Sequence, residues 1–328
     1  MLREPEVCLW GSTALISKGF AYSLVSGALL GSLIVLPECM SNYSAMELVV
    51  GRFIVFGVWV AAIVLFRREI IQRIQLDGIK PWVLVALLTN VLYYLCIAIS
   101  IRSLGGVFAC VLMAALPMVF QKYFLRHHSG NNLTLPLLLL VGALFLLITQ
   151  KFDQGFGDSS EQSIVNGLFW LLLASISWLL GTRLQLMMTL NRQDIDQSDH
   201  YLLTGLGSAL ALPLIFPLIW LDHPELTLFP EGFESTDWST YGLGMLVAGI
   251  LATGIARIYR SRALLHTRHP GLYPNTYLEV FFGVMFVFAV EGRTPDNQEW
   301  AVILFLVCGM ILFHRSQPIS QTVSASSG

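Results

Sequence analysis

The chain has 328 residues, of which 55% are hydrophobic and 12% charged, and its formal net charge is −2. Soluble globular domains carry about 25% charged residues, so this composition excludes an ordinary soluble protein and indicates an integral membrane protein. The lipid bilayer is therefore the first partner that the sequence implies. The near-neutral charge balance, without a basic stripe, indicates no nucleic-acid partner.

Ten apolar runs follow one another along the chain. A helix needs about 20 mostly apolar residues to cross the hydrocarbon layer. Runs of that kind lie near residues 19–37, 45–66, 81–101, 104–124, 133–150, 164–188, 201–221, 239–262, 271–290 and 299–314. The polar ends, residues 1–18 and 316–328, are predicted to be cytoplasmic tails, the second of them disordered. The predicted fold is an all-α integral membrane protein with ten transmembrane helices.

Lys and Arg are distributed unevenly between the two sets of connections. One set, which includes both tails, contains most of them, whereas the other contains only Arg102, Lys151 and Arg293. The connection at 222–238 belongs to the second set and is acidic. Because cytoplasmic loops carry an excess of Lys and Arg, both termini are predicted to be cytoplasmic. The predicted location is the cell (inner) membrane.

With both ends on one side, the ten helices divide into five in each half. The first half would span 19–150 and the second 164–315, joined by an external linker at 151–163. Since five is an odd number, the second half must run inverted relative to the first. Inverted repeats are the architecture of many secondary transporters, whose binding site lies near the midplane between the repeats.

Two charged residues are predicted to lie deep in the membrane. Arg52 is about 10 Å from the outer start of its helix, and Glu279 is about 12 Å from the cytoplasmic start of the ninth. Charged groups at such depths normally face the interior of a bundle or a watery cavity. Both are therefore candidate residues of a substrate pathway or of ion coupling, although a buried structural ion pair is the alternative.

Glu47 lies in the same helix as Arg52, but the two cannot easily pair. A spacing of five residues turns by about 140°, against about 40° for a spacing of four, so the side chains point to different sides. Glu47 is predicted to be close to water at the outer end of the helix. Arg52 then needs a partner from another helix, and Glu279 is one candidate.

The remaining candidate site residues are uncharged. Asn90 lies near the middle of the third run and is followed by Tyr93 and Tyr94. With Trp178 and Tyr277, these tyrosines suit an apolar or aromatic solute, although interfacial aromatic belts also explain such residues.

Other notable residues have simpler interpretations. Arg183 and Arg257 are predicted to extend to the cytoplasmic headgroups from the ends of their helices. The five cysteines are scattered and the histidines lack ligand spacing, so neither a metal nor a cofactor is expected. Gly27 and Gly31 form a G-x-x-x-G face, which favours close contact between helices.

Four stretches together resemble the drug/metabolite transporter superfamily and, within it, the ten-helix EamA-type permeases. They are "KGFAYSLVSGALLG" at 18–31, "ELVVGRF" at 47–53, "SISWLLGTRLQ" at 175–185 and "YLEVFFGVMFVFAVEG" at 277–292. The second is similar to the Glu-x-x-x-x-Arg of the RarD-like branch, and in the fourth Val280 replaces the family's proline. The resemblance implies two inverted five-helix repeats around a central cavity, with the fifth and tenth helices peripheral. It also implies transport of small organic solutes, often amino acids or related metabolites, without ATP.

The predicted function is a secondary transporter that moves a small amino-acid-like or drug-like metabolite by alternating access, as a monomer or homodimer. Protons are a candidate coupling ion. The chain contains no Walker-type loop for ATP-driven pumping and no clustered catalytic motif, so it is not predicted to be an enzyme. A membrane-embedded lipid-modifying enzyme, a channel and a non-transporting receptor are the alternatives.

Overall fold

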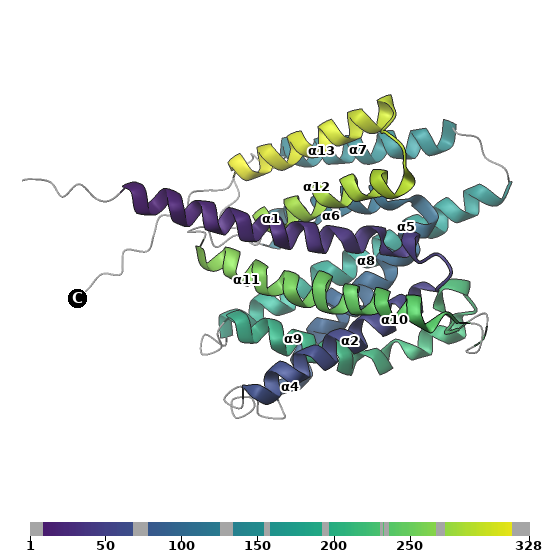
Figure 1. Ribbon diagram of the computed structural model, residues 1–328. Helices are drawn as coiled ribbons and strands as arrows, with labels where there is room; N and C mark the ends of the chain where they lie inside the picture. The colour runs from purple at the N-terminus through teal and green to yellow at the C-terminus, as the bar shows by residue number, and fades with distance from the viewer. Residues whose placement is uncertain are drawn as a thin grey trace, which may run out of the picture.

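The computed structural model describes residues 9–67, 78–124, 134–153, 158–191, 197–229, 232, 236–266 and 273–316. Every regular element within these ranges is helical, and none of the described residues forms a strand. The predicted all-α fold is confirmed. The helices lie side by side in one bundle (Figure 1).

The helices of the first half are α1 (Leu9–Cys39), α2 (Ala45–Phe66), α4 (Ile79–Ala86), the π-helical segment η2 (Leu87–Leu92), α5 (Tyr93–Leu104), α6 (Gly106–Phe124) and α7 (Thr134–Asp153). The second half begins with α8 (Asp158–Asn191), α9 (Gln197–Ala211) and the short 3₁₀ turns η4 (Leu212–Leu214), η5 (Phe216–Leu221) and η6 (Pro224–Leu226). It continues with α10 (Trp238–Leu246), the π-helical segment η7 (Val247–Ile255), α11 (Ala256–His266), α12 (Tyr273–Glu291) and α13 (Asn297–Ser316).

Five helical stretches of the described chain are long and apolar enough to cross a membrane: Lys18–Cys39, Ala45–Phe66, Ile79–Leu104, Ser163–Met188 and Trp238–Ala263. Three shorter apolar stretches lie at Gly106–Leu116, Thr134–Gln150 and Asn297–Phe313. The membrane character of the chain is thus supported by its described helices, while the count of ten spans stays a prediction.

Three predicted helix boundaries differ from the structure by six residues or more. α1 begins at Leu9 rather than 19, and α8 begins at Asp158 rather than 164. The seventh run was predicted as one helix over 201–221, but its α-helix ends at Ala211 and continues only as 3₁₀ turns. Pro213 and Pro217 explain this end, because proline donates no backbone hydrogen bond and disfavours the α conformation in the residue before it.

The start of α1 and the end of α13 lie on the same side of the bundle, which we call the terminal side (Figure 1). The turns between α1 and α2 and between α12 and α13 lie on the opposite side. α7 and α13 pack on each other along one edge of the bundle and otherwise contact mainly α6 and α12. This is the peripheral position that the resemblance implies for the fifth and tenth helices.

The packing of the first half has a counterpart in the second. α1 packs on α11 and α12, whereas α8 packs on α5 and α6. Likewise α2 packs on η7 and α9 packs on α4. Suppose that each predicted span of the first half corresponds to the span five positions later. The contacts of α1 with α11 and α12 then correspond to those of α8 with α5 and α6. In the same way the contact of α2 with η7 corresponds to that of α9 with α4.

The third and the eighth predicted spans share a second feature, an interruption of the α-helix by π-helical turns. η2 follows eight residues of α4, and η7 follows nine residues of α10. π-helical turns within α-helices are rare and frequently mark functional sites. η2 holds two residues that line the cavity described below, and η7 hydrogen-bonds to a third lining residue, Arg52.

Gly27 and Gly31 bring α1 against α12. A Cβ atom on Gly27 would lie 2.6 Å from the Cβ of Leu278, and one on Gly31 would lie 2.8 Å from the carbonyl oxygen of Glu279. Only glycine permits this approach, so the close contact predicted from the G-x-x-x-G pattern is confirmed. The contact also sets the position of the helical turn that carries Glu279.

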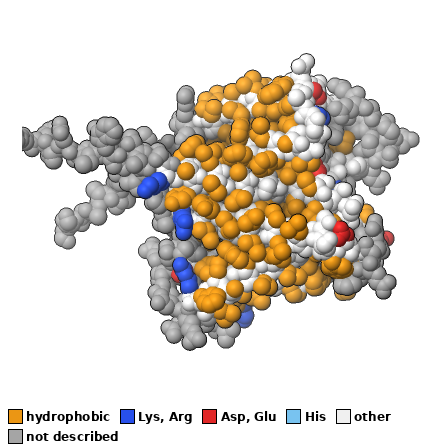
Figure 2. Space-filling model, in the orientation of Figure 1, with side chains coloured by type: hydrophobic (Ala, Val, Ile, Leu, Met, Phe, Trp, Pro, Cys, Tyr) orange, Lys and Arg blue, Asp and Glu red, His pale blue; other side chains and the backbone are white. Residues whose placement is uncertain are grey.

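The side of the bundle seen in Figure 2 is covered by hydrophobic side chains. Lys and Arg lie mainly along its terminal edge, and Asp and Glu mainly along the opposite edge. Exposed apolar residues such as Val58, Phe145 and Leu243 contribute to the apolar surface of the bundle, at 66%, 65% and 66% exposure. A continuous apolar surface between two charged edges is what a bilayer-spanning protein presents.

Candidate functional site

A cavity of ≈ 190 Å³ lies between the two halves of the bundle. Its walls come from α1, α2, η2, α5 and α6 of the first half and from α8, α9, α11 and α12 of the second. None of its lining residues belongs to α7 or α13. The lining residues are Leu30, Leu33, Ile34, Arg52, Thr89, Asn90, Tyr93, Tyr94, Ile97, Met113, Leu116, Trp178, Thr182, Gln185, Tyr201, Thr204, Arg257, Arg260 and Glu279.

Five of the seven residues predicted for the site line this cavity: Arg52, Asn90, Tyr93, Tyr94 and Glu279. They come from α2, η2, α5 and α12, and no two of these elements are neighbours in sequence except η2 and α5. The other two predicted residues, Glu47 and Tyr277, lie elsewhere.

Arg52 is buried, with 6% of its surface exposed. Its Nε donates a hydrogen bond of 2.8 Å to Oγ1 of Thr253 in η7. Its Cζ lies 4.1 Å from the centre of the Tyr94 ring, a distance at which an aromatic face attracts a cation. Within the described part of the chain, Nη1 of Arg52 has no hydrogen-bond partner. The guanidinium is thus held at Nε, while Nη1 can still donate a hydrogen bond to a ligand.

Thr253 can accept the Arg52 hydrogen bond because its own hydroxyl hydrogen is directed elsewhere. Its own hydroxyl donates 2.7 Å to the carbonyl oxygen of Ala248, five residues back. A hydroxyl has one donor and two acceptor positions, so the oxygen remains free to accept from Arg52. Thr253 therefore fixes the direction of the guanidinium across the interface between α2 and η7.

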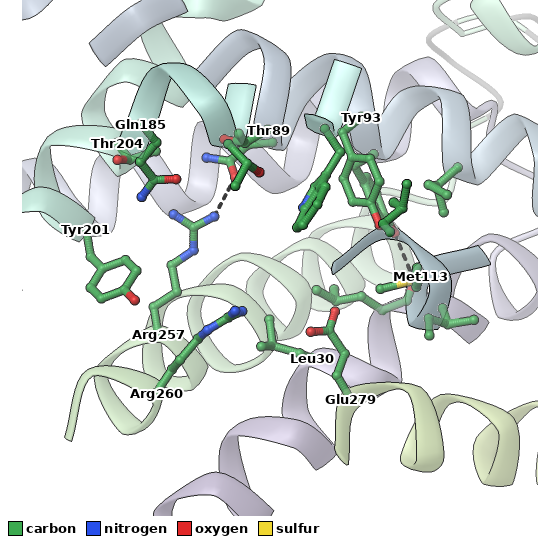
Figure 3. A pocket seen from close by; sticks show the side chains of 18 of the residues that line it. Leu30, Thr89, Tyr93, Met113, Gln185, Tyr201, Thr204, Arg257, Arg260 and Glu279 are labelled. Carbon is green, nitrogen blue, oxygen red and sulfur yellow. Dashed lines mark hydrogen bonds between the residues drawn. The ribbon is translucent and has the colours of Figure 1, made fainter. Parts of the chain in front are cut away.

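Asn90 makes a corresponding contact from the other π-helical segment. Its Nδ2 donates 2.8 Å to Oγ of Ser208 in α9, and Ser208 in turn donates 2.8 Å to the carbonyl oxygen of Thr204. The Oδ1 of Asn90 accepts a 2.6 Å hydrogen bond from Nη2 of Arg257, marked by a dashed line in Figure 3. Each π-helical segment thus hydrogen-bonds to the second helix of the other half.

The interpretation of Arg257 as a residue that extends to the headgroups is wrong. Its side chain turns into the cavity, where it binds Asn90 and places its Cζ 5.2 Å from the centre of the Phe56 ring. An amide oxygen inside the bundle offers the guanidinium a fixed acceptor that sequence position alone does not reveal. Arg183, by contrast, is exposed and does not line the cavity.

Glu279 lines the same cavity as Arg52, but the two do not form the salt bridge that was one candidate arrangement. Arg52 instead uses Thr253 and the Tyr94 ring. Figure 3 shows Glu279 from α12 and Arg260 from α11 pointing toward the same space. Of the described residues that line the cavity, Glu279 alone is acidic.

Polar and apolar lining residues occupy different parts of the cavity. Gln185, Tyr201 and Arg260 lie about 6–9 Å from the helix ends on the terminal side, at about 1.5 Å per residue. The apolar lining residues come from α1, α5 and α6: Leu30, Leu33, Ile34, Ile97, Met113 and Leu116. The cavity therefore has a polar part directed toward the terminal side and an apolar wall deeper in the bundle.

Glu47 belongs to the opposite end of the bundle, outside the cavity. It forms a capping box with Ser44, in which Ser44 N donates 2.6 Å to Oε2 of Glu47 and Glu47 N donates 3.1 Å to Ser44 Oγ. Its Oε1 accepts from the backbone N–H of Phe229. As the helical spacing predicts, Glu47 does not bind Arg52. The predicted exposure to water is wrong, since Glu47 is only 2% exposed beneath the connection between α9 and α10.

A network of polar contacts closes this end of the bundle. Nη1 of Arg102, at the end of α5, donates 2.6 Å to Oε2 of Glu225. The same guanidinium donates to the carbonyl oxygens of Met40 and Tyr43 in the turn after α1. Ala45 N also donates to Glu225, at 2.9 Å. We call these five residues the closing network; none of them lines the cavity.

Tyr277, the last predicted site residue, faces α13. Its ring packs edge-on against Phe313 with the centroids 5.8 Å apart. It contributes to the contact between α12 and α13 rather than to the cavity. Among the described residues, no group of three His, Cys, Asp or Glu side chains is arranged to hold a metal ion.

Seven polar lining residues were not predicted from the sequence to lie in a site: Thr89, Thr182, Gln185, Tyr201, Thr204, Arg257 and Arg260. A signal exists for two of them, because Thr182 and Gln185 share one face of α8 with Trp178 at helical spacing. The arginines of α11 carry no such signal. Arg257 and Arg260 lie near the end of their helix, and from that position a side chain can reach either the lipid headgroups or a cavity.

Comparison with known proteins gives a membrane relative and a shared fold. No family model matches the chain. The chain is 22% identical over 330 residues to the inner membrane protein YtfF of Escherichia coli (strain K12), and the match covers 94% of this chain and 99% of the relative. A solved crystal structure superposes with a TM-score of 0.57 at 14% identity, covering 92% of this chain and 96% of that one. The whole helical bundle is thus similar to a known fold, and the relative is an inner membrane protein.

Proposed function

We propose that this chain is a secondary transporter of the EamA type, which moves a small organic solute across the inner membrane by alternating access and without ATP. The observation that carries the proposal is the cavity between the two halves, which is lined by buried polar groups, while the closing network joins helix ends outside it at the opposite end of the bundle. Polar groups inside a membrane bundle mark substrate or ion pathways.

Two features support ten spans arranged as inverted repeats. The helix contacts of the first half map onto those of the second when helices five positions apart are paired. η2 and η7 then occupy corresponding places, and each hydrogen-bonds to the second helix of the opposite half. Transporters with inverted repeats bind their substrate at broken helices near this interface.

The terminal side is proposed to be cytoplasmic. Lys and Arg are concentrated on this edge of the apolar surface, as the positive-inside rule requires (Figure 2). The polar part of the cavity is directed toward the same side, which supports our assignment of this structure to an inward-facing state of the proposed cycle. In an outward-facing state the closing network would be broken and the arginines of α11 would move toward α8 and α9.

The lining residues suggest roles in the transport cycle. Arg52 and Arg257 hold an anionic group of the solute, and the rings of Tyr93 and Trp178 pack on its apolar part. Glu279 carries the proton if transport is proton-coupled, because it is the acidic residue of the cavity and lies at the contact between α1 and α12. Rocking of one half against the other would change the exposure of all of these groups together.

Counterflow in proteoliposomes tests the proposal. Purified protein is reconstituted, loaded with a pool of unlabelled amino acids and organic acids, and supplied with each labelled solute outside. A carrier gives saturable uptake that depends on the internal pool, and Arg52→Gln reduces it. Arg183→Gln is the matched control, since Arg183 is an exposed arginine outside the cavity. Uptake without saturation or counterflow would indicate a channel instead.

A further inference from the structure

The charges that line the cavity do not balance. Among the described residues that line it, Arg52 and Arg257 hydrogen-bond to uncharged groups, Thr253 and Asn90, and one acidic residue, Glu279, lies in the same cavity, which leaves an excess of positive charge. Guanidinium groups stay protonated in proteins, so this excess cannot be removed by losing protons. A buried charge is costly unless it is compensated by a partner of opposite sign. The lining thus favours a ligand that brings negative charge.

Arg52 offers a defined place for that charge. Its Nε is occupied by Thr253 and its face by the Tyr94 ring, while Nη1 has no partner within the described residues although the side chain is only 6% exposed. Arginine presents its donors as a planar fork that matches a carboxylate. The two fixed contacts hold this fork in one orientation before any ligand arrives, which reduces the cost of ordering on binding.

Arg257 is held in a comparable way. Asn90 accepts from its Nη2 at 2.6 Å, and Asn90 is itself anchored on Ser208. A guanidinium has five N–H donors, so this contact uses a small part of its capacity. Figure 3 shows Arg257 reaching across the cavity from α11 toward η2.

The remaining walls define the rest of the ligand. Tyr93 and Trp178 present aromatic surface, and the apolar side chains of α1, α5 and α6 include Leu30 and Met113. The cavity volume of ≈ 190 Å³ is below the range of about 300–1,000 Å³ that holds drug-sized ligands. A small molecule with a charged end and an apolar body fits these walls.

We propose that the transported solute is a small organic carboxylate with a net negative charge and an apolar or aromatic body, rather than a zwitterionic amino acid or an amine. Its carboxylate binds the free edge of Arg52 and reaches Arg257, and its body packs on Tyr93 and Trp178. A zwitterion would bring no net charge to offset the excess of arginine. This inference rests on the proposed function only in calling the ligand a transported solute.

Matched probe molecules test the charge of the ligand directly. One set is 3-phenylpropionate, L-phenylalanine and phenethylamine, which share a skeleton and differ in carrying a carboxylate, both groups or an amine alone. An aliphatic set is hexanoate, L-norleucine and pentylamine. Thermal unfolding of the purified protein in detergent is followed with each probe, since a ligand that binds the folded state raises the Tm. The carboxylate of at least one set should give the largest rise within its set.

Variants then connect the effect to the cavity. Arg52→Gln and Arg257→Gln should each weaken the binding of the stabilising carboxylate by about tenfold or more, because a charge-assisted contact is lost. Arg183→Gln should leave it unchanged. The comparison among probes on the unmodified protein stands even if one variant does not fold.

Three outcomes would overturn the inference: no rise with either carboxylate, a larger rise with the amine or the zwitterion in both sets, or full retention of binding in both variants. Counterflow with the same probes separates this from the proposed function. Carboxylate binding without counterflow would contradict transport and leave the ligand class supported, whereas counterflow of an amine or zwitterion would support transport and contradict the ligand class.

Discussion

Arg102 and Glu225 form a salt bridge of 2.6 Å between the end of α5 and the short turn η6. Arg102 also donates to the carbonyl oxygens of Met40 and Tyr43. One guanidinium therefore joins three segments that are far apart in the chain. Because hydrogen bonds to charged groups are stronger than neutral ones, this residue is the natural point at which to loosen the closing network.

Arg102→Gln is expected to favour the state in which the cavity opens away from the terminal side, at the end where the closing network lies. A cysteine placed at Leu33, which lines the cavity, should react several-fold faster with a membrane-impermeant thiol reagent added from that side, in a background without the native cysteines. Arg293→Gln is the matched control, because Arg293 also forms 2.6 Å salt bridges at this end but lies between α12 and α13. Equal rates in the two variants would argue against a gate at Arg102.

Thr253→Val removes the acceptor that holds Arg52. The Nε donor would then be buried without a partner, which costs about 1–3 kcal/mol. We expect a lower Tm in detergent and weaker binding of a carboxylate probe. Thr253→Ser keeps the hydroxyl and should stay close to the unmodified protein on both measures. A valine variant that binds the carboxylate as well as the serine variant does would show that Arg52 needs no fixed direction.

Gly31→Ala is expected to separate α1 from α12. The new Cβ would lie 2.8 Å from the backbone of Glu279 and of Gly283, where backbone must shift, and overpacking of this kind costs about 1–3 kcal/mol. Gly242→Ala is the control, because nothing lies within 4 Å of a Cβ there. At that half-buried helical position, where a Cβ meets open space, alanine should be neutral or more stable by up to about 1 kcal/mol. Thermal unfolding of both variants checks the difference.

Glu279→Gln tests the proposed proton coupling. Glutamine keeps the shape of the side chain but cannot carry the charge, so accumulation driven by a pH gradient should be lost while counterflow at constant pH persists. Glu291→Gln, at the opposite end of the same helix, is the control for a glutamate outside the cavity. If Glu279→Gln still accumulates the solute under a pH gradient as the unmodified protein does, Glu279 does not carry the coupled proton.

Asp237 gives the chain a specific dependence on acid. Hydrogen bonds from the side chains of Ser239 and then Thr240, with backbone donors, lower the pKa of its carboxyl group from 3.8 to about 2. A depressed pKa in the folded state means stability that is complete above the ordinary pKa and is lost as the pH falls toward 2. Asp237→Asn keeps a good N-cap at neutral pH and should remove this part of the acid loss. Unfolding at a series of pH values between neutral and acid measures it.

Much of the fold could be predicted from the sequence because the bilayer imposes local rules. Apolar length identifies the helical runs, and each of the ten predicted runs overlaps a helix of the structure. Depth along those helices was sufficient to select Arg52, Asn90, Tyr93, Tyr94 and Glu279, and all five line the cavity. A polar group inside lipid must face protein or water, so its position along the helix predicts its surroundings.

The partners of these residues were beyond prediction. Arg52 binds Thr253, 201 residues away, rather than Glu279, and Asn90 binds Ser208, 118 residues away. Glu47 is buried because the segment at Phe229 folds over it. Each outcome depends on which helices become neighbours and how they are rotated, and no local pattern contains that information.

By itself the sequence determined a helical membrane protein, the approximate limits of its helices and the deep polar positions, since hydrophobic length and depth act within one segment at a time. Only the tertiary structure decided that Arg257 turns inward, that Arg102 joins three segments and that the cavity carries an excess of arginine. The physical reason is that hydrogen bonds and charge balance are made between segments, and packing alone determines which segments meet.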